Sequence, residues 1–178
     1  LGELIAERLT GLVVEKYQNE LMRWGTEQEP QARALYEFYC GVDVEQVAFV
    51  EHPTIAMAGA SPDGLVGDDG LIECKSRRQK FQVETISTDQ VPAEYILQLQ
   101  TGLLVTGRQW IDFVSYCGGM PMYVKRVFPD AAIQGAILDA ARSFEARIAV
   151  RLEEYRETLA RQPVLIETER TNEEEITA

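Results

Sequence analysis

Two carboxylates and one lysine lie close together in the segment SPDGLVGDDGLIECKS, residues 61–76. Because side chains alternate between the two faces of a strand, Glu73 and Lys75 are predicted to point the same way. If the chain on either side of the turn at Gly67–Gly70 pairs as a hairpin, Asp63 comes alongside Glu73. The segment therefore predicts two carboxylates and one ammonium group in one small pocket.

These residue types suit a metal-dependent reaction on a phosphodiester. Mg²⁺ prefers carboxylate and carbonyl oxygens at about 2.0–2.1 Å, so Asp63, Glu73 and the backbone carbonyl of Cys74 are the candidate ligands. A bound ion lowers the pKa of a water molecule, and a second ion about 3.5–4 Å away would stabilise the leaving oxygen. Lys75 would orient the attacking water or neutralise the charge that develops on the phosphate. The alternative is a surface hairpin whose salt bridge contributes only ~0–1 kcal/mol.

The charge of the chain is unevenly distributed. A net charge of −12 argues against a protein that coats nucleic acid, since phosphate binding depends on Lys and Arg. However, Arg77, Arg78 and Lys80 follow Lys75 directly, and we expect this basic cluster to face an anion. Residues 167–178 carry five glutamates and are predicted to form an acidic, solvated tail.

The composition is that of an ordinary globular protein, with 46% hydrophobic and 26% charged residues. A length of 178 residues predicts one domain over 1–178 with a real core. No apolar run approaches the ~18–20 residues that span a bilayer, so no membrane segment is expected. Three widely spaced cysteines and a single histidine, His52, disfavour a disulfide framework and a zinc site, and favour a reducing cytoplasm.

The hydrophobic periodicity predicts an α/β fold, with a central mixed β-sheet flanked by helices. A first helix is expected from Leu1 to a break at Trp24-Gly25, and a long core-packing helix from Asp130 onward. The other expected elements are helices over 30–41 and 92–105, an antiparallel meander over 42–49, 55–60 and 65–74, and strands over 110–116 and 122–128.

The motif residues also resemble a known family. Ser61-Pro62-Asp63-Gly64 followed by Leu71-Ile72-Glu73-Cys74-Lys75 resembles the PD-(D/E)XK nuclease superfamily, and within it the phage recombination exonucleases typified by phage lambda exonuclease. Two further segments resemble that family's early helical motif and the helix after its active-site strand: Trp24-Gly25, Glu29, Ala32-Arg33, Leu35 and Glu37-Phe38, and then Tyr95, Gln98 and Gln100. The resemblance covers roughly residues 20 to 110.

This resemblance implies a restriction-endonuclease-like core and a role for each matched residue. Lys75 would be the catalytic lysine, and Asp63, Glu73, the Cys74 carbonyl and Glu29 would bind the metals. Gln98 would lie near the water and the scissile phosphate. Of the remaining matches, Ser61 would lie at the 5′-phosphate end, and Met22 would be an apolar wedge that parts the strands. The family's arginine-containing segment for the 5′-phosphate is not matched, so Arg77, Arg78 and Lys80 are predicted to contact phosphates instead.

The resemblance further implies the activity. It predicts a 5′→3′ exonuclease that degrades one strand of linear double-stranded DNA to 5′-mononucleotides and leaves a 3′ single strand for recombination by annealing. Two Mg²⁺ ions are expected, with Mn²⁺ as a substitute. The expected partners are DNA ends, two further copies in a ring-shaped homotrimer, and a single-strand annealing protein. The expected location is the cytoplasm of a bacterial host, with the gene carried by a phage or prophage. Two alternatives stay open: a structure- or sequence-specific endonuclease, and a non-catalytic DNA-binding subunit.

Overall fold

The computed structural model describes residues 1–13, 20–55, 58–161, 164–166 and 168, without the side chains of residues 20–22. The chain divides into two compact units, one of Leu1–Tyr17 with Leu138–Ala178 and one of Gln18–Ile137. The predicted acidic tail lies, apart from Thr168, outside the described residues. Within those ranges no helix has the length and apolar character needed to cross a membrane.

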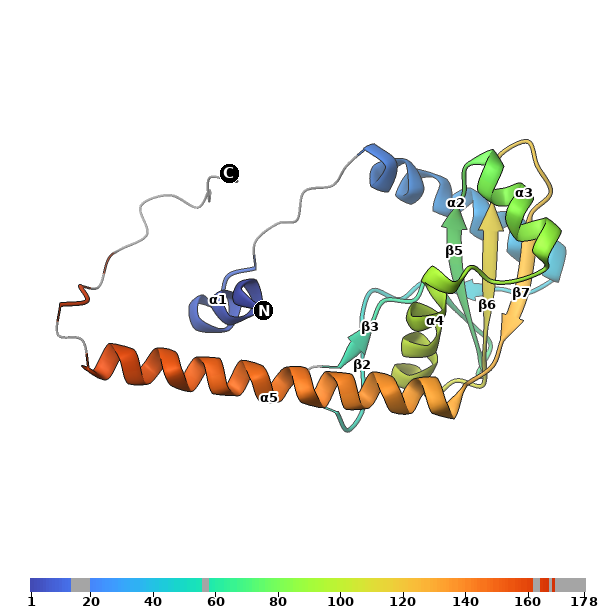
Figure 1. The fold of residues 1–178 in the computed structure, drawn as a ribbon. Coiled ribbons are helices and arrows are strands. Elements are labelled where there is room, and N and C mark those ends of the chain that lie inside the picture. The colour runs from blue at the N-terminus through green and yellow to red at the C-terminus, as the bar shows by residue number, and fades with distance from the viewer. Residues whose placement is uncertain (14–19, 56–57, 162–163, 167, 169–178) are drawn as a thin grey trace. The chain divides into compact units, whose positions relative to one another are not determined.

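A five-stranded sheet forms the centre of the unit Gln18–Ile137 (Figure 1). Its strand order is β1-β4-β5-β6-β7, in which β5 and β6 run parallel and every other neighbouring pair is antiparallel. The predicted mixed sheet is therefore confirmed. The strands are β1 Val44–Glu45, β4 Gly64–Val66, β5 Gly70–Ser76, β6 Trp110–Tyr116 and β7 Tyr123–Val127. A separate two-stranded sheet pairs β2, Val50–Glu51, with β3, Gly59–Ala60.

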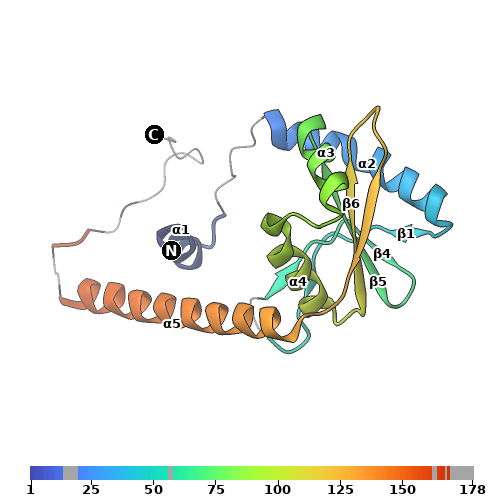
Figure 2. The same cartoon turned by 45° about the vertical axis from the view of Figure 1, so that its right-hand side comes forward.

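Helices cover both faces of this sheet (Figure 2). Alternate residues of β5 and β6 enter two different hydrophobic clusters, so the clusters lie on opposite faces. Helix α2, Glu20–Cys40, packs against one face through Ala32 and Tyr36. Helix α4, Ala93–Thr106, packs against the other through Leu99 and Leu103. This arrangement fixes both helices relative to the middle strands, which include β5 with Glu73 and Lys75.

The predicted helix break at Trp24-Gly25 is wrong. Helix α2 is continuous from Glu20 to Cys40 and contains Pro30 in its interior. Pro30 removes one helical hydrogen bond, but the packing of Ala32 and Tyr36 on the sheet outweighs this local preference. The first predicted helix is correspondingly short, because α1 spans only Gly2–Thr10 and ends at Gly11 with a left-handed φ of 70°.

Two further helices differ from the expectation. Helix α3, Gln79–Thr88, was not predicted, because its buried residues are the polar Gln82 and Thr85, which leave no apolar stripe in the sequence. Helix α5, Ala131–Arg161, begins as expected, but Ile148 is its only buried residue, so the prediction of a core-packing helix is wrong. Its segment in the unit with α1 carries the ion pair between Arg8 and Glu145, at 2.7 Å.

A buried carboxylate fastens α2 to the sheet. The hydroxyl of Tyr36 donates to Asp112 Oδ2 at 2.8 Å, and Arg126 donates to both oxygens of Asp112 at 2.9 Å. Burial, and then this hydrogen bond, raise the pKa of the Tyr36 hydroxyl. Tyr36 therefore stabilises the contact between helix and strand both by packing and by a specific donor.

Replacing Tyr36 with phenylalanine is expected to lower the free energy of unfolding by about 1–2 kcal/mol, because a buried carboxylate loses one of its donors. Urea denaturation measures the change. Tyr39→Phe is the matched control, since Tyr39 lies on the same helix but is 74% exposed. Equal effects of the two substitutions would contradict this role of the Tyr36 hydroxyl.

Candidate active site

The β4–β5 hairpin forms in the predicted register. Gly64 pairs with Ile72 and Val66 with Gly70, so Asp63 lies beside Glu73 at the open end of the hairpin. Asp63 Oδ2 accepts a hydrogen bond of 2.7 Å from the backbone N–H of Cys74. Strand β4 begins at Gly64, and the preceding extended residues Gly59–Ala60 pair with β2 in the separate sheet. Gly64 is required here, since the side chain of Val44 on β1 occupies the place of a Cβ.

Lys75 and Gln98 both contact the same carboxylate oxygen of Glu73. Lys75 Nζ lies 2.5 Å from Glu73 Oε1, which confirms that the two side chains share a face of β5. The amide Nε2 of Gln98, on α4, donates to the same Oε1 at 2.5 Å. The ring of Tyr95, one turn before Gln98, lies 5.5 Å from Lys75 Nζ. Three of the predicted catalytic residues, Glu73, Lys75 and Gln98, are thus brought together from β5 and α4.

The electrostatics of this group favour an added cation. Burial, and then the charge of Glu73, raise the pKa of Asp63 to about 7, against the opposing hydrogen bond from Cys74. Burial also raises the pKa of Glu73, although Lys75 opposes this. Burial alone would lower the pKa of Lys75, but the charge and hydrogen bond of Glu73 outweigh it and raise that pKa. The buried carboxylate of Glu73 and the half-buried one of Asp63, with one ammonium group, leave negative charge that a divalent ion would neutralise.

The stability of the metal-free protein is expected to fall as pH rises toward neutrality. Asp63 has a pKa of about 7 in the folded chain against an ordinary 3.8, so the folded chain holds this proton more tightly than the unfolded chain. The stabilisation is fully present below about pH 4 and is lost as pH rises through about 7. Urea midpoints between about pH 5 and pH 8 should fall more steeply for the wild type than for Asp63→Asn. Parallel curves would contradict the assignment.

The donor set fits a hard divalent cation through Asp63, Glu73 and one backbone oxygen. The N–H and C=O of one residue in a strand point to the same edge, so the carbonyl of Cys74 faces the edge where Asp63 lies. Glu29 is ion-paired with Arg33 on α2, although its charge still acts on Asp63 and Glu73. In the described part of the chain no three His, Cys, Asp or Glu side chains are gathered as a ready metal cluster.

The residues predicted to contact DNA differ in their exposure to solvent. Ser61, Arg78 and Lys80 are exposed, as a phosphate contact requires. Arg77 is only 6% exposed and donates to the side chains of Glu94 and Tyr95, so little of its guanidinium is available to a phosphate. Met22 belongs to α2, but its side chain lies outside the described residues.

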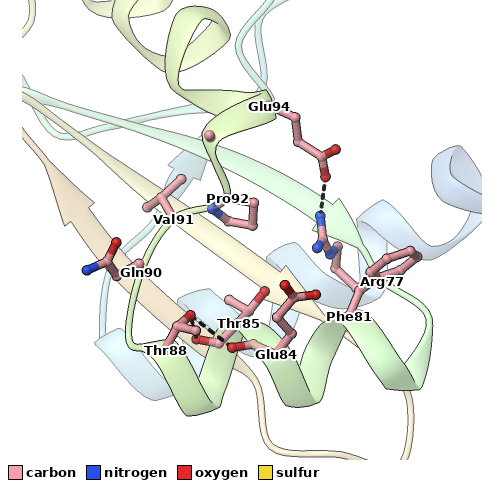
Figure 3. Close-up of a pocket in the computed structure, with 10 residues that line it drawn as sticks. Arg77, Phe81, Glu84, Thr85, Thr88, Gln90, Val91, Pro92 and Glu94 are labelled. Atoms are coloured by element: carbon pink, nitrogen blue, oxygen red, sulfur yellow. Dashed lines mark hydrogen bonds and ion pairs between the residues drawn. The ribbon is translucent and has the colours of Figure 1, made fainter.

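A cavity of about 470 Å³ lies between α3 and the start of α4 (Figure 3). Arg77, Phe81, Glu84, Thr85, Pro92 and Glu94 are among its lining residues. The sequence did not predict that Arg77 and Tyr95 would be partners. The sequence does place Tyr95 on the same helical face as Gln98, because the two residues are three positions apart. That spacing was the one signal that Tyr95 lies near the site.

A mixed sheet with an Asp, a Glu-x-Lys strand and a helical Gln is the core of a PD-(D/E)XK nuclease. Residues 2–109 match the model of the YqaJ-like viral recombinase domain, and the chain belongs to this family. The predicted membership in the lambda-type exonuclease family, and the prediction of a nuclease, are thereby confirmed.

Solved structures agree with this assignment. The alkaline exonuclease LHK-Exo from Laribacter hongkongensis shares 43% identity and a TM-score of 0.82, over 90% of this chain and 83% of that one. A second structure of LHK-Exo, in complex with dAMP, matches with the same values. A phage-related exonuclease from Haemophilus somnus 129PT, at 13% identity, a TM-score of 0.56 and coverage of 90% and 81%, shares the fold. The curated proteins include no significant match.

Proposed function

We propose that this chain is a Mg²⁺-dependent 5′→3′ exonuclease that degrades one strand of linear double-stranded DNA to 5′-mononucleotides. The observation that carries the proposal is the convergence of Asp63, Glu73 and Lys75 at the β4–β5 hairpin. The close relative described as an alkaline exonuclease supports it, and the dAMP bound to that relative is a nucleotide of the kind expected as product.

The residues of the site divide the work of phosphodiester hydrolysis. Asp63, Glu73 and the Cys74 carbonyl would hold the ion, and a bound Mg²⁺ would supply an activated water near neutral pH. The water oxygen forms the new bond to phosphorus, and the bond from phosphorus to the 3′ oxygen of the terminal nucleotide breaks. That oxygen takes up a proton, so the nucleotide leaves with a 3′ hydroxyl and its existing 5′-phosphate, and the attacked phosphate becomes the new 5′ end of the shortened strand. Lys75 stabilises the charge that develops on the phosphate oxygens, and the Gln98 amide orients the groups around Glu73.

The finer parts of the proposal concern metal, assembly and partner. Two ions are proposed, with Mn²⁺ as a substitute, because a second ion stabilises the leaving oxygen. A ring-shaped homotrimer around the duplex would let a chain of net charge −12 remain on DNA, since enclosure replaces a strongly basic surface. A single-strand annealing protein would receive the 3′ strand. We further propose that a phage or prophage encodes the protein and that it acts in the cytoplasm of the bacterial host.

Contact with the DNA end is assigned to Ser61, Arg78, Lys80 and Met22. Ser61 is exposed at the start of the SPDG motif and is proposed to lie at the 5′-phosphate end. Arg78 and Lys80 are proposed to contact backbone phosphates, and Met22 to part the strands. Glu29 is proposed as an outer metal ligand that leaves Arg33 when the ion binds.

Digestion of matched DNA substrates tests the proposal. The purified protein is incubated with Mg²⁺ and a linear duplex labelled at its 5′ or 3′ ends, or with a closed circular duplex of the same sequence. We expect the 5′ label to appear as a mononucleotide, the 3′-labelled strand to persist, and the circle to stay intact. Discrete fragments from the circle would favour the endonuclease, and binding without cleavage would favour the non-catalytic subunit.

A further inference from the structure

Arg77 is a buried cation next to the active-site strand, which is unexpected for a residue in an exposed basic run. Its side chain is 7% exposed, whereas Arg78 and Lys80, which follow it, are exposed. The guanidinium donates from Nη1 to Tyr95 Oη at 2.7 Å and to Glu94 Oε1 at 2.8 Å. Both bonds use Nη1, and the burial of the side chain leaves little of the guanidinium available to a phosphate.

The partners of Arg77 belong to the first turn of α4. Figure 3 shows the guanidinium reaching from the end of β5 toward Glu94 across the edge of the cavity. Since Arg77 comes two residues after Lys75, its side chain leaves the same side of the chain. The pair Arg77–Tyr95 therefore ties the end of the active-site strand to the start of the helix.

Tyr95 connects the first turn of α4 to the residues of the candidate active site. Its ring stacks on Phe113 at 5.5 Å and lies 5.5 Å from Lys75 Nζ. Gln98 follows Tyr95 by three residues, close to one helical turn, and donates to Glu73 Oε1. A shift of the first turn of α4 would thus move both the Tyr95 ring, which lies against Lys75, and the Gln98 amide, which donates to Glu73.

We propose that Arg77 is a positioning residue: through Tyr95 it fixes the first turn of α4, and so holds Gln98 and Lys75 in place around Glu73. The inference rests on the proposed nuclease function and assigns no contact between Arg77 and DNA. Arg77 acts on the rate of the chemical step because small displacements of catalytic groups cost as much as about 10²-fold in rate.

Steady-state kinetics on linear duplex test the proposal with Arg77→Gln, Tyr95→Phe and the double variant. Each single variant is expected to lower kcat about 10–100-fold, with KM changed less than about 3-fold. The double variant should be no slower than Arg77→Gln alone, because both changes break one interaction. Arg77→Lys, which keeps a donor, should recover part of the loss. Arg142→Gln, on exposed α5, is the control and should match the wild type.

Salt-dependent DNA binding and thermal melting separate a positioning role of Arg77 from a phosphate contact and from a loss of folding. Arg77→Gln should keep the wild-type salt slope, whereas Arg78→Gln should reduce it by about one. A raised KM with unchanged kcat and a reduced slope for Arg77→Gln would show a phosphate contact and overturn the proposal. Unchanged kinetics for Tyr95→Phe, which keeps the stacked ring, would overturn it even if Arg77→Gln failed to fold. An inactive wild type would instead refute the proposed function.

Discussion

Replacing Lys75 with methionine is expected to lower kcat on linear duplex DNA by about 10²–10³-fold, with little change in DNA binding. Lys75 Nζ lies 2.5 Å from Glu73 Oε1 and is held over the ring of Tyr95, so its charge is fixed at the reacting position. Methionine keeps a similar unbranched side chain and removes only the charge. Single-turnover digestion measures the loss directly.

The control for this substitution is Lys125→Met. Lys125 is also ion-paired, with Asp89 at 3.0 Å, but it lies on β7 away from the hairpin and its side chain is 41% exposed. We expect wild-type activity from it. Undiminished kcat in Lys75→Met, with the fold intact, would remove Lys75 from the chemistry.

Replacing Asp63 with asparagine is expected to abolish the stabilisation by divalent ions and to lower kcat by about 10³-fold or more, since a bound ion contributes several kcal/mol to charge stabilisation. The amide oxygen of the new side chain can still accept the N–H of Cys74, so the hairpin should persist. In the absence of metal the variant should melt above the wild type near neutral pH, because the repulsion between the carboxylates of Asp63 and Glu73 is relieved.

Melting curves with and without Mg²⁺ measure both effects. The wild type should show a melting temperature that rises with ion concentration, and Asp63→Asn should not. Asp68→Asn, in the exposed turn of the same hairpin, is the matched control and should keep the metal-dependent rise. A metal-dependent shift that survives in Asp63→Asn would place the ion elsewhere.

The hairpin could be predicted from the sequence because its information is local. Period-two alternation placed Glu73 and Lys75 on one face, and the turn at Gly67, with its φ of 53°, fixed the register that brings Asp63 to them. Strand β6 and helix α4 were also predicted close to their observed bounds, since their apolar patterns are strong. These elements carry most of the candidate site.

The parts that failed depend on contacts distant in sequence. Pro30 and Gly25 indicated helix ends, but packing on the sheet keeps α2 continuous. Helix α3 shows no apolar pattern because one of the residues that it buries, Gln82, is polar. Hydrogen bonds to Ser115 and to the carbonyl of Pro121 satisfy the Gln82 amide inside the protein. Arg77 looked exposed within a basic run, and only the fold brings Tyr95 to cover it.

The most direct test of the metal-dependent site is a crystal of the Lys75→Met protein soaked with Mn²⁺ and a short 5′-phosphorylated duplex. The account predicts anomalous density between the carboxylates of Asp63 and Glu73 and the carbonyl of Cys74, with a DNA phosphate oxygen in contact with the ion. Ordered DNA with no anomalous density at this position, or with the ion bound at another group of residues, would contradict it.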